Sequence, residues 1–328
     1  MTPKTVLCLL LAPFAVAAQS LPEELIEAGH WKQARVIVEA TFRNNPNDAL
    51  ANYLLSQIRN AFYDTQSPMA LAEKAVALDG GVAKYHRQLA EVIGVMAQRS
   101  GPWRQLLLAR RFKKEIDAAL ALDGRDLQAW RDLMEFYLRA PGIVGGDKAR
   151  ARSIAERIGG IDAAEGFLAQ ARLAEFDNES GALERLYLRA VESRPGRYRA
   201  RIALSSFYLS SGHQDFQSAE KQAREAIKID RTRVDAYAVL ADIYASRAQW
   251  REMDSILAIA DTDAPDDLLP HFRAADRVLA SGRDLPRAEL HFRRYLNAEP
   301  EGNAPTIEET RRKLGLVLQR TSRAPAPR

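Results

Sequence analysis

The side chains that could carry chemistry in this sequence are its histidines and its adjacent carboxylates, and neither group is arranged for catalysis. The five histidines are never three or four residues apart, as two ligands on one helix face would be; they are His30, His86, His213, His271 and His291. No H-E-x-x-H motif is present to form a zinc site. Nor is there a G-x-S-x-G motif, the turn that presents a serine nucleophile. We therefore expect no metal, no cofactor and no enzymatic activity.

Adjacent carboxylates occur at positions 23–24, 266–267 and 308–309, each close to the expected start of a helix. Negative side chains at that end interact favourably with the helix dipole. This structural role accounts for the three pairs without acid–base catalysis.

One segment between two expected helices has an unusual composition for a simple turn. It contains three glycines and an apolar pair: Pro141, Gly142, Ile143, Val144, Gly145 and Gly146. A phosphate-binding loop is excluded because no strand precedes the segment and no Gly-Lys-Ser/Thr follows it. Two interpretations remain open, a functional loop such as a ligand clamp or a structured connection. In the second, Asp147 caps the next helix, and Ile143 and Val144 pack back onto the protein.

A second irregular segment, Ser100–Arg104, lies in an insertion of about ten residues relative to the spacing of the rest of the chain. The simplest explanation is a lengthened pair of helices, Tyr85–Arg99 and Trp103–Leu122. The Trp103 side chain is then either an exposed anchor for a partner or a plug for the hydrophobic gap that the insertion creates. We expect it to fill the gap.

The elements that position these residues are helices joined by short turns, because glycine and proline gather at intervals and no long β-type alternation occurs. The turns recur about every 34 to 36 residues, apart from the one longer spacing. They fall at Pro46, Gly80, Gly124, Gly160, Pro195, Arg231, Pro265 and Pro300. This is the period of a repeat built from two helices.

The residue five places before each turn tests this alignment. Most of these positions hold alanine: Ala75, Ala119, Ala155, Ala190, Ala226 and Ala260. A helix needs a small residue there if another helix approaches closely, as in a stack of helix pairs. Three positions earlier most residues are apolar, but Arg152 is not, so the repeat ending near Gly160 has the least regular register.

The clearest unit carries an amphipathic stripe on each of two helices and ends in proline. Its residues are Tyr237, Leu240, Ala241 and Tyr244, then Met253, Leu257 and Ala260, then Pro265. This pattern resembles the tetratricopeptide repeat, two antiparallel helices per roughly 34 residues. The resemblance extends from about Glu23 to Gln319. It implies an all-α, right-handed solenoid of about eight helix pairs over residues 19–320, ending in a capping helix, with residues 321–328 as a disordered tail.

In such arrays the first helix of each pair lines a concave face on which a protein or peptide binds. The positions that we expect to point into that groove are Tyr53, Gln57, Asn60, Lys84, Arg87, Glu91, Arg131, Glu135, Arg172, Arg199, Asp242, Arg273 and Arg277. Arginine recurs among them, and its guanidinium group binds carboxylates through paired hydrogen bonds. The groove would therefore suit a partner with acidic groups. The alternative is a solvated helix face.

The first residues, 1–18, are typical of a secretory signal peptide. Lys4 precedes the apolar run Val6–Ala18, which ends in small residues. A membrane-spanning helix needs about 20 apolar residues, so the run favours cleavage near Ala17 or Ala18 over a retained anchor. Cleavage would remove Cys8, the only cysteine. We expect a periplasmic or secreted protein with no stable membrane span after cleavage.

The composition agrees with a folded protein that works by binding. Hydrophobic residues make up 47% of the chain and charged residues 27%. The net charge of +4 is spread without a basic block, so we expect no nucleic-acid partner. The main hypothesis is a bacterial envelope scaffold that binds a protein or peptide. An architectural subunit of a larger envelope complex is the alternative, and an enzyme built on the solenoid is a further one.

Overall fold

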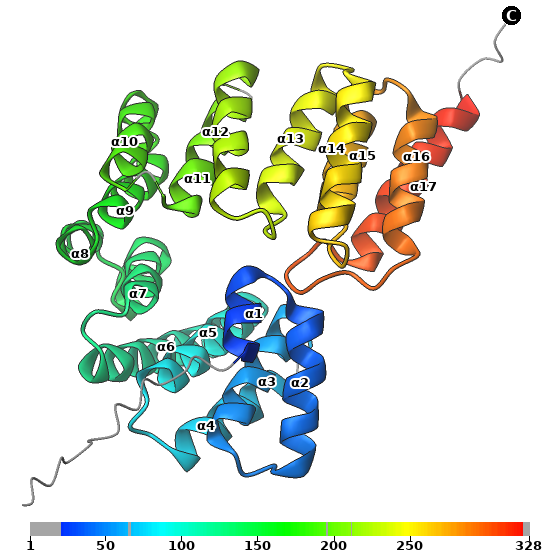
Figure 1. Ribbon diagram of the computed structural model, residues 1–328. Coiled ribbons are helices and arrows are strands. Elements are labelled where there is room, and N and C mark those ends of the chain that lie inside the picture. Colours follow the sequence, from blue (N-terminus) through cyan, green and yellow to red (C-terminus); the bar gives the residue numbers. More distant parts are fainter. Residues whose placement is uncertain (1–20, 65–66, 195, 211, 324–328) are drawn as a thin grey trace, which may run out of the picture.

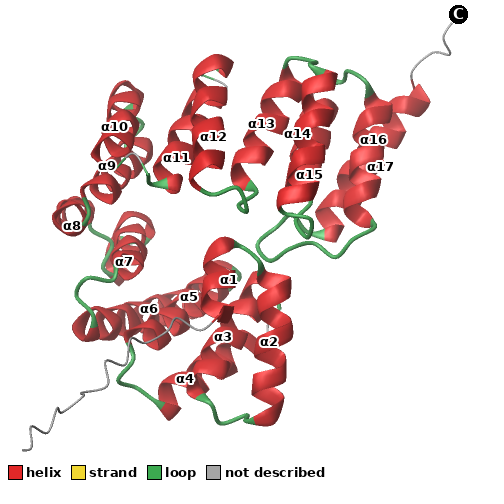
Figure 2. Cartoon of the chain, viewed as in Figure 1, coloured by secondary structure: helices red, strands yellow, loops and turns green. Residues whose placement is uncertain are grey.

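The computed structural model describes residues 21–64, 67–194, 196–210 and 212–323, and within these ranges the chain is helical with no strand. In this part of the chain seventeen α-helices and one short 3₁₀ turn follow one another, as Figures 1 and 2 show in outline. None of these helices is long and apolar enough to cross a membrane.

The helices pair in chain order. In the first half, α1 (Leu21–Ala28) pairs with α2 (Trp31–Asn44), α3 (Ala49–Ala61) with α4 (Ser67–Leu78), α5 (Ala83–Gln98) with α6 (Pro102–Leu122), and α7 (Leu127–Arg139) with α8 (Lys148–Ile161). The 3₁₀ turn η1 (Gly142–Val144) lies between α7 and α8. The second half comprises α9 (Ala163–Phe176), α10 (Ser180–Ser193), α11 (Tyr198–Leu209), α12 (Phe216–Ile229), α13 (Asp235–Ser246), α14 (Trp250–Asp263), α15 (Leu269–Ser281), α16 (Leu285–Leu296) and α17 (Ile307–Arg323).

Within the described ranges the chain thus forms eight antiparallel pairs followed by α17, which confirms the predicted all-α solenoid with a last, unpaired helix. Helix α17 continues past the expected end of the solenoid at residue 320. The signal peptide over residues 1–18, the turn at Pro195 and the tail from residue 324 lie outside the described residues and stay predictions.

Local signals explain where the helices start. Aspartate is the N-cap of α3, α7, α8, α9, α12 and α16, and in each case its carboxylate accepts a hydrogen bond from a backbone N–H of the first turn. Asp147 has this role for α8, as predicted. Each cap satisfies donors that no earlier carbonyl of the helix can reach.

The alanine series is the packing surface between helices. All six alanines are buried, with at most 2% of the side chain exposed. At the irregular repeat the turn predicted at Gly160 is wrong, because α8 continues to Ile161 and Asp162 begins the next helix. The glycine that matters there is Gly166, where an added Cβ would lie 2.3 Å from the Cα of Gly159. These two helices therefore cross more closely than any side chain would allow.

The solenoid closes on itself, which the sequence did not predict. Residues 31–35 and 61–63 contact the loops 264–268 and 299–304, and we call this contact the closing interface (Figure 1). The Lys32 ammonium donates to the carbonyl oxygens of Asp266 (2.5 Å) and Glu299 (3.1 Å). Arg35 forms a paired interaction with the Glu299 carboxylate at 2.7 and 2.8 Å.

The centre of the closing interface is buried. Glu301 is only 3% exposed, and its carboxylate accepts a hydrogen bond from the backbone N–H of Lys32 at 2.6 Å. Burial raises the pKa of Glu301 to about 7. Beside it, Gly302 lies so close to Trp31 that an added Cβ would be 2.5 Å from the indole ring. Two hydrogen bonds complete the contact: the Asn303 N–H donates to the Ala61 carbonyl oxygen, and the Tyr63 hydroxyl donates to the Ala304 carbonyl oxygen.

Candidate functional site

The first helices of the pairs form the inner layer of the ring. The odd-numbered helices from α7 to α17 contact one another in succession, as does α3 with α5. Helices on the inside of a curved stack approach more closely than those on the outside. Arg87 of α5 and Asp126, the N-cap of α7, form an ion pair at 3.3 Å, and the groove described below is lined by α5, α6 and α7 together.

One predicted groove residue is not available to a partner. Tyr53 is 4% exposed and packs against the ring of Tyr85, with 5.1 Å between the ring centroids. The prediction that it faces the groove is wrong because this position belongs to the core of the first repeats. Gln57, one turn later on the same helix, is half-buried.

Most of the charged candidates on the inner layer are paired with another repeat. The pairs are Lys84 with Glu23, Arg87 with Asp126, Arg172 with Glu135, and Arg277 with Asp242, while Asn60 donates to Glu91. Such pairs link successive repeats and leave few guanidinium groups free for a partner. Arg273 is the exception among the predicted arginines, because it is exposed and has no ion pair within the described residues.

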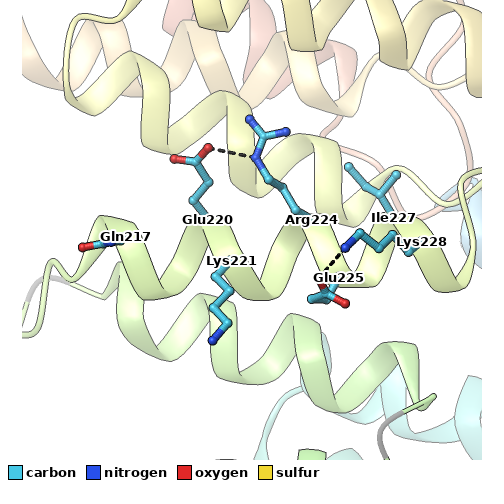
Figure 3. Close-up of a pocket in the computed structure, with 7 residues that line it drawn as sticks. All are labelled: Gln217, Glu220, Lys221, Arg224, Glu225, Ile227 and Lys228. Atoms are coloured by element: carbon cyan, nitrogen blue, oxygen red, sulfur yellow. Dashed lines mark hydrogen bonds and ion pairs between the residues drawn. The ribbon is translucent and has the colours of Figure 1, made fainter.

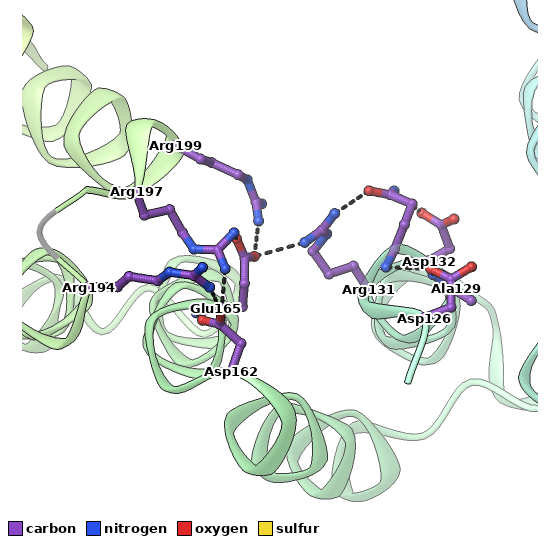
Figure 4. A network of polar contacts seen from close by, with 10 residues as sticks. Asp126, Ala129, Arg131, Asp132, Asp162, Glu165, Arg194, Arg197 and Arg199 are labelled. Carbon is purple, nitrogen blue, oxygen red and sulfur yellow. Dashed lines mark hydrogen bonds and ion pairs between the residues drawn. The ribbon is translucent and has the colours of Figure 1, made fainter. Parts of the chain in front are cut away.

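Two of the predicted arginines meet at a buried carboxylate. Glu165, at the start of α9, is 1% exposed and is surrounded by Arg131 of α7 (2.8 Å) and by Arg197 (3.2 Å) and Arg199 from the start of α11 (Figure 4). Arg194 and Arg197 also bind the neighbouring Asp162. Because burial and the charge of Arg131 oppose its protonated form, the pKa of Arg199 is lowered. We call this cluster the Glu165 hub.

The segment 141–146 is a compact turn between α7 and α8. Its backbone hydrogen bonds join Pro141 to Val144 and Gly146, and Asp147 to Tyr137. An added Cβ on Gly146 would lie 1.7 Å from the Ala140 carbonyl oxygen, so only glycine fits there. The prediction that Ile143 packs back onto the protein is wrong, because its side chain is 82% exposed; Val144 is half-buried.

Trp103 also departs from expectation. The lengthened helices α5 and α6 are present as predicted, but Trp103 is 84% exposed and does not fill a gap. It lies at the N-terminus of α6 and lines the same hollow as Ile143. The two irregular segments of the sequence therefore meet at one place in the structure.

That hollow has a volume of about 730 Å³ and is lined by one face of each of three helices and by η1. We call it the groove. Its lining residues recur at helical spacing: Glu91, Gly94, Val95 and Gln98 on α5; Pro102, Leu106, Ala109 and Phe112 on α6; Asp132, Glu135, Phe136 and Arg139 on α7. Phe112 stacks on Phe136 with 5.6 Å between centroids, and the Phe112 ring also lies next to Gly94, where an added Cβ would be at an ordinary contact distance of 3.5 Å.

The polar side of the groove carries more negative than positive charge. Glu135 is neutralised by Arg139 and Arg172, but no arginine or lysine lies within ion-pair distance of Glu91 or Asp132 in the described chain. Burial raises the pKa of Asp132 to about 6, and the charge of Glu91 adds to this shift. The protein around Glu91 raises its pKa too, although solvent still reaches its side chain.

A second hollow lies along α12 and offers little. It is lined by residues of that one helix, including Glu220, Arg224, Glu225 and Lys228 (Figure 3). Arg224 binds Glu220 at 2.9 Å and Lys228 binds Glu225 at 2.6 Å, so the charges pair within the helix. It is a solvated helix face.

Sequence spacing missed one histidine pair. His271 on α15 and His291 on α16 are buried, with 3.0 Å between their Nδ1 atoms, and His271 also contacts Asp261 at 3.0 Å. Burial lowers the pKa of His291 to about 4. These residues do not line the groove, and no group of His, Cys, Asp or Glu among the described residues could hold a metal ion. The helix period could not reveal them because they come from different helices.

Comparisons with known proteins support the fold. No protein-family description and no curated protein sequence matches this chain. Among solved structures, yeast Tom70 matches with a TM-score of 0.58 and 16% identity over 90% of this chain, which spans 59% of the Tom70 chain. A tetratricopeptide repeat protein from Thermus thermophilus matches with a TM-score of 0.50 and 17% identity, covering 58% of this chain and 96% of that one. At this identity the likeness establishes a tetratricopeptide-like solenoid and no activity.

Proposed function

We propose that this protein is a non-catalytic scaffold that binds a segment of a partner protein, and that the groove between α5, α6, α7 and η1 is its main contact. The observation that carries the proposal is the exposure of Trp103 and Ile143, which both line a largely apolar hollow. Large aromatic and aliphatic side chains left in water beside a concave apolar surface are typical of protein-binding sites. Rigid helices on three sides would limit the entropy lost on binding.

The bacterial envelope is the proposed location. The support is the apolar run Val6–Ala18 behind Lys4, and the fact that the only cysteine, Cys8, lies inside it. A chain left without cysteine by cleavage folds equally well in an oxidising compartment. Mass spectrometry of the N-terminus of the protein recovered from a periplasmic extract tests both the location and cleavage near Ala17 or Ala18.

The sequence favoured a partner with acidic groups, and the Glu165 hub is the cluster that could bind them. Four arginines there face two carboxylates, so positive charge is in excess. We propose that an acidic stretch of a partner contacts Arg131 and Arg199, next to the groove. Elsewhere on the inner layer the paired arginines do not support this preference.

Site-specific photocrosslinking in cells tests the main proposal. A photoreactive phenylalanine analogue is placed at position 103 or 143. The control position is Val36 on α2, an apolar residue that is 70% exposed and does not line the groove. We expect a discrete protein adduct from positions 103 and 143 and none from position 36. Equal adducts at all three positions, or none at 103 and 143, would contradict the proposal. The alternative, an architectural subunit, predicts the strongest adduct from position 36.

A further inference from the structure

The groove has two chemically different parts. The apolar part consists of Val95, Leu106, Phe112, Phe136 and Val144, with Trp103 and Ile143 at its mouth. Such a surface accepts a bulky aliphatic or aromatic side chain, because transferring that side chain from water is favourable by roughly 25 cal/mol per Å² of apolar area. The stacked rings of Phe112 and Phe136 form its rigid floor.

The polar part is short of positive charge. Asp132 Oδ1 accepts a hydrogen bond from Gln128 at 2.8 Å, but the buried Asp132 Oδ2 has no hydrogen-bond partner within the described chain. Glu91 has Asn60 as its partner, a neutral amide. The nearby Arg87 is engaged by Asp126, and Arg131 by Glu165. In a protein where most inner carboxylates are paired with arginine, these two have no arginine or lysine within ion-pair distance among the described residues, and Arg87 and Arg131 act on them only from farther away.

We infer that the groove binds a protein segment in which a bulky apolar side chain adjoins a lysine or arginine. The apolar side chain would occupy the space over Phe112 and Phe136, and the cation would reach Asp132 and Glu91. This inference rests on the proposed binding function and adds the chemistry of the partner. It differs from the acidic preference of the Glu165 hub, which lies on the next face of α7.

Other occupants fit the charges less well. An acidic segment would meet Asp132 and Glu91, and the one arginine at the mouth, Arg139, is already bound to Glu135 at 2.8 Å. An anionic membrane surface would be repelled by the same carboxylates. A second copy of the chain would have to supply an exposed apolar and basic segment of its own.

The preference can be measured with the full chain and a positional-scanning library of nine-residue peptides. We expect selection of Leu, Ile, Phe or Met next to Lys or Arg. The best lysine-containing peptide and its norleucine analogue, which keeps the carbon chain of lysine but lacks the ammonium group, are then titrated by fluorescence anisotropy. Loss of the charge should weaken binding to the native protein about ten-fold, as expected for one partly buried charge pair.

Variants locate the effect on the groove. In Asp132→Asn the ratio between the lysine and norleucine peptides should fall below about two-fold, while Trp103→Ala should weaken both peptides about ten-fold. Matched controls on α6 are Asp117→Asn and Leu107→Ala, both exposed and outside the groove, and neither should change binding. Glu91→Gln, at a solvent-accessible position, repeats the charge test if Asp132→Asn is unstable.

A pH series gives an independent readout. Asp132 faces Glu91 and Arg87 on α5 and Gln128 and Arg131 on its own helix, and its pKa is about 6. Acidification from pH 7.5 to 5 should therefore weaken the lysine peptide several-fold and leave the norleucine peptide unchanged.

The outcomes separate this inference from the proposed function. Peptides that bind through Trp103 without a preference for Lys or Arg, or with one for Asp or Glu, would overturn the inferred chemistry and leave the binding role intact. If no peptide binds, and phosphatidylglycerol vesicles instead change the tryptophan fluorescence of the native protein but not that of Trp103→Ala, both are wrong. A dimer in sedimentation that Trp103→Ala converts to monomer would identify a second copy as the occupant and overturn the inference as well.

Discussion

The closing interface and the groove are the two places where the structure departs from a regular stack of repeats. They differ in how much of their surface the chain itself buries. At the closing interface Lys32 and Glu301, 269 positions apart, meet at a buried contact where even Gly302 has no space to spare. In the groove, which α5, α6 and α7 line together, Trp103 and Ile143 remain in water. At the closing interface the chain itself buries the apolar surface and pairs the polar groups. The groove still exposes apolar area and carries negative charge that a partner could bury and neutralise.

This difference shows how function can be located in a repeat protein. Every repeat has the same kind of core, so the core does not distinguish one site from another. The irregular places in the repeat do distinguish one site from another. The question at each of them is whether the chain itself covers the surface that the irregularity exposes. Substitutions at the two places should therefore have opposite signatures: loss of stability at the closing interface, and loss of binding with little change of stability in the groove.

The largest loss of stability is expected from Gly302→Ala. The added Cβ would lie 2.5 to 2.9 Å from atoms of Trp31, so the ring must open or Trp31 must move. We expect a loss of about 3 kcal/mol in the free energy of unfolding, as for overpacking of a tight contact. Chemical denaturation measures this, and small-angle scattering should show a larger radius of gyration. Gly315→Ala on α17, where nothing lies within 4 Å, is the control and should be slightly stabilising.

The next effect, about 2 kcal/mol, is expected from Gly146→Ala, which lies in the turn beside the groove and does not line it. The new Cβ would lie 1.7 Å from the Ala140 carbonyl oxygen, a backbone atom that cannot rotate away. The turn of residues 141–146 should therefore rearrange and move Ile143. Gly142→Ala, in the same turn with open space around it, should be neutral. Equal melting temperatures for the two variants would contradict this account of the turn.

A smaller, pH-dependent effect is expected at Glu301. Its folded-state pKa is about 7, above the value near 4.3 of an unfolded glutamate, so the folded state holds a proton that the unfolded state has lost between those values. The stability from this group is complete at low pH and declines as the pH rises toward 7. Glu301→Gln has no charge to lose and should gain about 1.5 kcal/mol over the native protein between pH 4.5 and 8. Denaturation curves of the native protein and of the variant at each pH measure the difference. The contribution of the buried histidines to the pH dependence is the same in both proteins and therefore cancels.

The repeat itself was predictable, because its signal is local and recurs. The alanines at Ala75, Ala119 and Ala260 report a close helix approach at every turn, and the aspartate caps mark where helices begin. The irregular segments were also visible as segments. Their conformation was not, since the exposure of Trp103 and Ile143 depends on how α5, α6, α7 and η1 pack together, which no local pattern encodes.

The closing interface and the pairing of the arginines could not be predicted for a different reason. Both depend on residues far apart in sequence, such as Arg35 with Glu299 and Arg277 with Asp242. Ring closure follows from the curvature summed over all repeats, so a small change per repeat would leave the ends apart. A list of arginines on one face likewise says nothing about which carboxylates the next repeat presents to them.

The smallest change in stability is expected from Trp103→Ala, and this result is the most informative. Because the side chain is 84% exposed, its removal should alter the free energy of unfolding by less than about 0.5 kcal/mol. When Trp103→Ala is combined with the photoreactive residue at position 143, the crosslinked partner adduct should be lost, since a bulky apolar anchor of the groove is gone. A substantial destabilisation would mean that Trp103 packs in the native protein, and the contrast with the closing interface would then disappear. Stability kept and binding lost, in one variant, is the combination that only a surface reserved for a partner predicts.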